Sequence, residues 1–106
     1  MTTAKYSVSI DSVDVGTVTG QSTVINYGDF ESGMVHIPTG SSLTTLTWNV
    51  SSSEGGTYIP ARNADGAITQ TVSGGNAYPI PSDLRGARFL KITGDGDEIV
   101  SVTLKD

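Results

Sequence analysis

The residue types that hydrolytic enzymes use are all present in this chain, but their spacing matches no catalytic motif. His36 is the only histidine, and serines and aspartates are frequent enough for a Ser-His-Asp set to be written down. The G-x-S-x-G elbow that positions a nucleophilic serine is missing from the sequence. His36 also stands in an alternating strand pattern, where a structural role is the ordinary finding. We therefore expect no catalytic residue and no enzyme activity.

A second candidate site is the acidic segment that holds Asp95, Asp97 and Glu98, because carboxylate oxygens are ligands that calcium prefers. The segment reads Gly-Asp-Gly-Asp-Glu and lacks the loop length and spaced ligands of an EF-hand. Asp-Gly pairs are also what a tight hairpin turn selects. We interpret the segment as a hairpin turn and expect neither a metal nor a cofactor, with calcium binding as the alternative.

Aromatic residues suggest a third kind of site, because exposed rings can serve as platforms for sugars. Trp48 alternates in phase with apolar residues two positions away on either side, which predicts a buried ring. Three tyrosines flank Gly or Pro turns, where we expect the ring to pack over a strand end and the hydroxyl to meet water; they are Tyr27, Tyr58 and Tyr78.

Basic residues are few, and most of them fall close together in the sequence. Four of the six lie within residues 62–91, namely Arg62, Arg85, Arg88 and Lys91. In an acidic chain such a group can form a local docking patch. Solvated strand faces explain these side chains equally well.

Charge and cysteine content narrow the possible partners. The net charge of -5 and the pI of about 4.5 oppose binding to nucleic acid and to anionic lipid surfaces. The absence of cysteine excludes disulfides, thiolate metal sites and cysteine nucleophiles. No segment approaches the roughly 20 apolar residues of a membrane span, and residues 1–5 are not followed by the apolar core of a signal peptide, so we expect no secretion by that route. We expect a soluble protein that binds neither membranes nor nucleic acid.

The elements that would position these residues are strands. Residues 46, 48 and 50 are apolar and alternate with polar neighbours, which is the period of a half-buried strand. The Ser-Ser-Ser-Glu-Gly-Gly and Ala-Asp-Gly segments that follow predict two consecutive hairpins. Residues 11–20 fit either a strand or an extended arm, and residues 82–85 fit a short 3₁₀ turn. About eight strands are expected, at residues 6–10, 22–27, 34–37, 43–50, 67–73, 77–80, 88–92 and 99–104.

Length and composition favour one all-β domain. The chain has 106 residues, enough for a single hydrophobic core, and its 10 Val and 8 Ile against 5 Leu favour strands. Short, evenly spaced strands separated by turns predict an antiparallel two-sheet β-sandwich or jelly roll. We expect a single domain over residues 1–106, in which residues 1–6 form an extended N-terminal arm.

Several segments together resemble small virion proteins of tailed bacteriophages. The resemblance covers about residues 32–104 and depends on an apolar strand that ends in Pro, an aromatic-x-Val-Ser strand, two glycine turns and a late Phe-x-Lys strand. The segments that carry it are GMVHIP (33–38), LTWNVS (46–51), GGTY (55–58), ADG (64–66), YPIP (78–81) and GARFLKI (86–92).

The resemblance implies a jelly-roll-like fold and a non-enzymatic structural role, closest to a capsid decoration or cement protein on the outer surface of the head. The implied partners are the major capsid protein or other virion proteins, with copies forming a homo-oligomer on the particle after synthesis in the host cytoplasm. A carbohydrate- or receptor-binding domain of a tail or head fibre is the alternative. Because arms and loops carry adaptable contacts, the expected contact residues are Thr2, Thr3, Lys5, Tyr6, Arg62, Arg85 and Arg88.

Overall fold

The first half of the chain pairs with the second half in reverse order, so that the first strand meets the last. The structure is a computed structural model, which describes residues 7–17 and 23–105. Four nested antiparallel pairs result: β1 (Ser7–Val15) with β11 (Glu98–Lys105), β2 (Ile25–Asn26) with β10 (Phe89–Gly94), β3 (Ser32–His36) with β9 (Ala77–Pro79), and β4 (Thr45–Ser51) with β8 (Thr69–Thr71).

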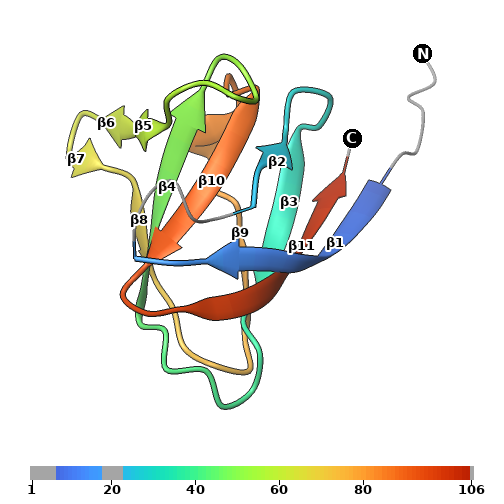
Figure 1. Ribbon diagram of the computed structural model, residues 1–106, viewed down its shortest axis with the longest axis vertical. Helices are drawn as coiled ribbons and strands as arrows, with labels where there is room; N and C mark the ends of the chain where they lie inside the picture. Colours follow the sequence, from blue (N-terminus) through green and yellow to red (C-terminus); the bar gives the residue numbers. More distant parts are fainter. Residues whose placement is uncertain (1–6, 18–22, 106) are drawn as a thin grey trace.

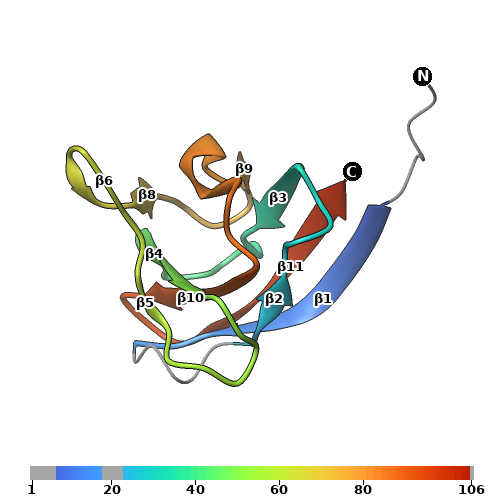
Figure 2. The same cartoon turned by 90° about the horizontal axis from the view of Figure 1, so that it is seen from above.

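These pairs form two packed sheets. One sheet has the order β1-β11-β3-β9, and in the other β2-β10-β4 continues to β8. Figures 1 and 2 show β4 and β10 in one layer and β1, β3 and β11 in the other. Eight strands wrapped as a long hairpin over two sheets define a jelly roll. The predicted antiparallel two-sheet sandwich is therefore confirmed.

Three further short strands form an insertion between β4 and β8. β5 (Ile59–Pro60) returns along β4 after the glycine turn, and β6 (Arg62–Asn63) pairs with β7 (Gly66–Ala67) across the Asp-Gly turn. Both predicted hairpins are present. The predicted strand at residues 67–73 is divided between β7 and β8, and that at residues 22–27 is shortened to β2. In the described part of the chain, no helix is long and apolar enough to cross a membrane.

The core lies between the sheets, and side chains that alternate along the longer strands, such as β4, β10 and β11, point into it. Trp48 lies opposite Ile92 of β10, is completely buried, and donates a hydrogen bond from Nε1 to Oε1 of Gln70 at 2.9 Å. Its predicted burial is confirmed. The other fully buried side chains come from both sheets and include Val13, Val15, Ile25, Val35, Leu46, Leu90, Ile92, Val100, Val102 and Leu104.

β1 extends beyond the predicted strand at residues 6–10, and of the two alternatives for residues 11–20, a strand or an extended arm, residues 11–15 form a strand. Ile10 pairs with Val102 and Val13 pairs with Val100, so β1 uses one residue more than β11 over this stretch. Such a bulge changes which residues face the core. The alternation in the sequence therefore breaks at residue 11, although the strand continues to Val15.

The acidic segment is a turn, but the prediction that it closes a hairpin is wrong. It connects β10 in one sheet to β11 in the other, and these two strands do not pair. The amide of Gly94 donates to the carbonyl of Gly16 at 2.8 Å, and a Cβ on Gly94 would lie 2.9 Å from a methyl carbon of Leu43. Glycine allows this close approach between the layers. An Asp-Gly sequence specifies a turn without specifying whether the flanking strands pair.

We predict that Trp48→Ala lowers the free energy of unfolding by about 3–5 kcal/mol, because it removes a large buried ring and leaves a cavity. Urea titration followed by circular dichroism measures the change. Ile99→Ala is the control, since Ile99 is 51% exposed and its truncation is expected to cost less than about 0.5 kcal/mol. An unchanged midpoint for Trp48→Ala would contradict the burial of the ring and favour a sugar platform.

Candidate binding groove

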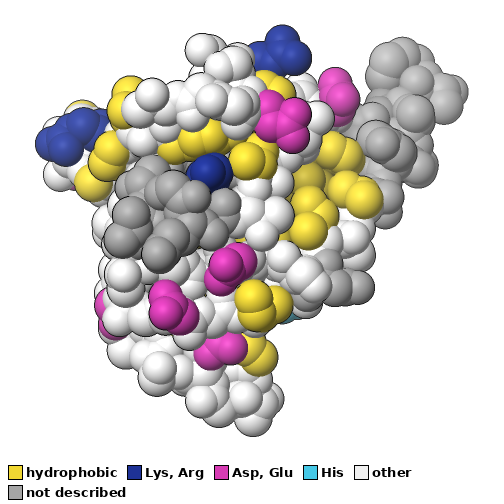
Figure 3. Space-filling model, in the orientation of Figure 1, with side chains coloured by type: hydrophobic (Ala, Val, Ile, Leu, Met, Phe, Trp, Pro, Cys, Tyr) yellow, Lys and Arg dark blue, Asp and Glu magenta, His cyan; other side chains and the backbone are white. Residues whose placement is uncertain are grey.

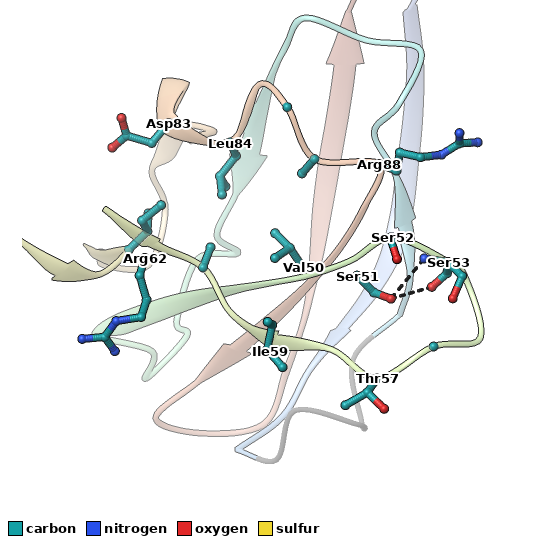
Figure 4. Close-up of a pocket in the computed structure, with 15 residues that line it drawn as sticks. Val50, Ser51, Ser52, Ser53, Thr57, Ile59, Arg62, Asp83, Leu84 and Arg88 are labelled. Carbon is teal, nitrogen blue, oxygen red and sulfur yellow. Dashed lines mark hydrogen bonds between the residues drawn. The ribbon is translucent and has the colours of Figure 1, made fainter. Parts of the chain in front are cut away.

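A groove of about 770 Å³ opens beside the β4–β5 hairpin, opposite the loop that follows the short 3₁₀ helix η2 (Ser82–Leu84). Figure 4 shows side chains from both walls turned toward this space. The groove has an apolar floor and a polar rim. The floor consists of Val50, Ile59, Ala61, Ile68, Leu84 and Ala87.

The floor continues the hydrophobic core to the surface. Val50 is the last residue of β4 on the core-facing side, in phase with Trp48, and it is half-buried. Ile59 pairs with Val50 across the hairpin and is 58% exposed. Leu84 is buried and anchors η2 against the core. Apolar surface exposed in a hollow is typical of a binding site.

Both walls are held by their own hydrogen bonds. On the hairpin side, the Ser51 hydroxyl donates to the Ser53 carbonyl at 2.7 Å and accepts the Ser53 amide at 3.2 Å. On the loop side, the Leu84 amide donates to the Pro81 carbonyl, and the Ala87 amide donates to the Leu84 carbonyl, each at 3.0 Å. The groove is therefore preformed, which reduces the entropy lost on binding.

Two arginines mark the ends of the groove. Figure 4 shows Arg62 at one end and Arg88 at the other, with both guanidinium groups extending outward. Among the described residues, Asp83 is the remaining ionisable residue of the lining, and its Oδ2 accepts a hydrogen bond from Nδ2 of Asn63 at 3.0 Å. The lining thus carries one net positive charge on a chain whose net charge is -5.

The structure separates the three arginines that the sequence groups together. Arg62 and Arg88 line the groove, whereas Arg85 does not. The charge of Arg85 instead acts on Tyr27: burial raises the pKa of Tyr27, and Arg85 offsets part of this rise. Lys91 lies 4.6 Å from the ring centre of Tyr58. The other predicted contact residues lie outside the described residues; they are Thr2, Thr3, Lys5 and Tyr6.

Of the aromatic residues considered for sugar binding, none lines the groove. Trp48 and Tyr27 are buried, and Tyr58 is largely so. The prediction that the tyrosine hydroxyls meet water is wrong for Tyr27, whose side chain is 1% exposed. The hydroxyl of Tyr27 donates to the Glu31 carbonyl at 3.2 Å, and that of Tyr58 donates to the Glu54 carbonyl at 2.7 Å.

The remaining titratable candidates also lie outside the groove. His36 projects from β3, with its Nε2 at 3.2 Å from the Thr103 hydroxyl of β11. Within residues 7–17 and 23–105, no group of three histidine or acidic side chains is arranged to hold a metal ion. No sequence pattern described above predicts the groove. Two features of the sequence could have indicated it: the apolar residue Ile59, which lies opposite Val50, and the small neighbouring residues Gly86 and Ala87.

Asp95 joins the turn between the sheets to the start of β4. Its carboxylate accepts hydrogen bonds from the Thr44 hydroxyl, from the Thr44 amide at 3.0 Å and from the Thr45 amide at 3.3 Å. These bonds, above all that from the Thr44 hydroxyl, lower the pKa of Asp95 from 3.8 to about 2. The carboxylate therefore has a structural role in this turn.

Comparison with known proteins finds a similar fold but no family. No known protein family and no curated protein matches the chain. Among solved structures, the chain is similar to the SPBc2 prophage-derived protein YomS, with a TM-score of 0.61 and 15% sequence identity. The similarity covers 100% of this chain and 98% of that one. The two proteins therefore share a fold over their whole described length.

We predict that Asp95→Ala lowers the melting temperature at neutral pH by removing the three hydrogen bonds to the ionised carboxylate. Because the folded-state pKa is depressed, the stabilisation is complete above the ordinary pKa and is lost as pH falls from about 4 to about 2. The difference between the variant and the unmodified protein should therefore shrink across this window in thermal melts. Asp97→Ala, in the same turn, is the control. If Asp95→Ala lowered the melting temperature equally at about pH 4 and at about pH 2, the structural role of the ionised carboxylate would be contradicted.

We also predict that EDTA leaves the melting temperature unchanged and that millimolar calcium raises it little, because a ligand stabilises only a fold that binds it. Differential scanning fluorimetry with and without each additive provides the measurement. A calcium-dependent rise of several degrees that Asp97→Ala abolishes would establish the calcium alternative.

Proposed function

We propose that this protein is a non-enzymatic structural component of a tailed-bacteriophage particle that binds the outer surface of the head shell as a decoration or cement protein. The observation that carries the proposal is the full-length jelly roll, which this chain shares with a prophage-derived protein. The motif resemblance over residues 32–104 supports the same assignment.

The physical properties of the fold suit this role. A decoration protein needs a rigid body and a docking surface, and it gains avidity by contacting several shell subunits at once. The two packed sheets supply the rigid body, and the preformed groove supplies an apolar docking surface with arginines at its ends. Its partner is the major capsid protein or another virion protein. Copies occupy symmetric positions on the shell as a homo-oligomer.

Charge distribution supports a defined orientation on the shell. Figure 3 shows Lys and Arg side chains in the upper half of the visible face, where β5–β7 lie, and acidic side chains both beside them and in the lower half. An acidic shell surface attracts the basic side chains of the upper half and repels the acidic side chains of the lower half. Complementary potentials of this kind fix the register of a complex more than its affinity.

The alternative role is receptor or carbohydrate binding by a tail or head fibre. Jelly rolls also occur in lectin domains, so the fold alone does not separate the two. The buried Trp48 and the lack of aromatic residues among the described residues of the groove favour the structural role.

We predict that the purified protein co-sediments with empty heads of its parent phage at a saturable, repeating stoichiometry and has no hydrolase activity. Arg88→Glu should weaken binding several-fold or abolish it and make the residual binding more sensitive to salt, because it reverses a charge facing an acidic surface. Removing residues 2–6 should weaken binding with little change in melting temperature.

Arg85→Glu tests whether the groove or the whole basic group makes the contact. It introduces the same charge change three positions from Arg88 but outside the groove lining. Binding through the groove predicts a small effect of this variant. No co-sedimentation, together with saturable binding to host polysaccharide, would instead assign the protein to receptor binding.

A further inference from the structure

We infer that the groove is a docking site for an extended peptide segment that places an apolar side chain on the floor and acidic residues at both ends. The source of this peptide, a segment of the head-shell protein, rests on the proposed function. The ligand chemistry itself follows from the groove.

The apolar floor defines the centre of the ligand. Ile59 is 58% exposed and contributes to a floor shared with Val50 and Leu84, whose side chains belong to the core. A ligand side chain bound there removes Ile59 from water without burying a polar group of the floor, because the floor residues are apolar. Aliphatic residues such as Leu, Ile or Val satisfy this requirement.

The shape of the groove favours an extended chain. The loop wall contains Gly86, and a Cβ added at this position meets no atom within 4 Å, so the space beside it is open to a ligand backbone. The hydroxyl group of Ser52 stands on the opposite wall, where Figure 4 shows this residue. A peptide offers backbone donors and acceptors to such a hydroxyl along its length.

Charge defines the ends of the ligand. Arg62 and Arg88 lie at opposite ends and extend outward, so they reach residues that flank the seated side chain. Asp83 is already engaged by Asn63. Carboxylates on both sides of an apolar centre therefore complement the groove, and lysines at the same places are repelled.

Three fluorescently labelled peptides test this complementarity. They share a Leu-Ile-Val centre and differ only in their flanking residues, which are Glu, Gln or Lys. Fluorescence anisotropy at low salt should rank their affinities with Glu first and Lys last. Arg62→Gln and Arg88→Gln should each weaken the Glu-flanked peptide about threefold, the size expected for one exposed ion pair, and leave the Gln-flanked peptide unchanged.

Two matched pairs of variants test the location. Ile59→Asp should weaken the Glu-flanked peptide at least tenfold, whereas Ile99→Asp, at a similarly exposed isoleucine of β11, should not. Gly86→Trp should block the groove, whereas Gly55→Trp changes a glycine with equally open surroundings outside the lining. Thermal melts verify that all four variants are folded.

Equal affinity for Glu- and Lys-flanked peptides, or equal effects within both pairs of variants, would overturn the inference. A dimer in solution that Ile59→Asp dissociates would also overturn it, by assigning the groove to a second copy of this chain. If the unmodified protein binds heads but not the peptides, the groove inference fails and the proposed function stands. If it binds the Glu-flanked peptide with the expected variant effects but not heads, the groove inference stands and the head assignment fails.

Discussion

Pairing between the two ends of the chain is the constraint on which the rest of the structure depends. The ladder between β1 and β11 joins the first described strand to the last, and the other three pairs are nested inside it. Val100, Val102 and Leu104 of β11 form a row on the core side of their sheet and are buried there. Because such contacts join residues far apart in sequence, forming them requires closing long loops before the contacts contribute stability.

The groove forms because β4 pairs with two different strands along its length. β4 is longer than its partner β8, and its last residues pair instead with β5 of the insertion. The core row that contains Trp48 therefore continues to Val50 at the edge of the sandwich, where the loop after η2 forms the facing wall. A site built on the margin of a rigid core holds its geometry without a ligand.

The fold and the site carry different kinds of information about function. A jelly roll is compatible with capsid proteins, lectins and enzymes, so the fold that this chain shares with a prophage-derived protein does not specify chemistry. The features that indicate a type of ligand are the exposed Ile59 on an apolar floor and the arginines at both ends of the groove. These features favour recognition of a peptide over recognition of a sugar.

The sequence by itself determined the properties that depend on neighbouring residues. The alternation around Trp48 predicts its burial, turn residues predict the hairpins and the 3₁₀ turn at Ser82–Leu84, and strand spacing predicts a two-sheet sandwich. Local pattern specifies which face a side chain occupies and where the chain turns, because both are set by backbone geometry over a few residues.

Only the tertiary structure decided which strands pair and which side chains meet. The acidic turn carrying Asp95 resembles a hairpin locally but links two sheets, and the bulge in β1 is visible only against β11. Likewise, Arg85 and Arg88 are three positions apart, yet only Arg88 reaches the groove with the distant Arg62. Such groupings depend on contacts between residues far apart in the chain, which the local periodicity of the sequence does not predict.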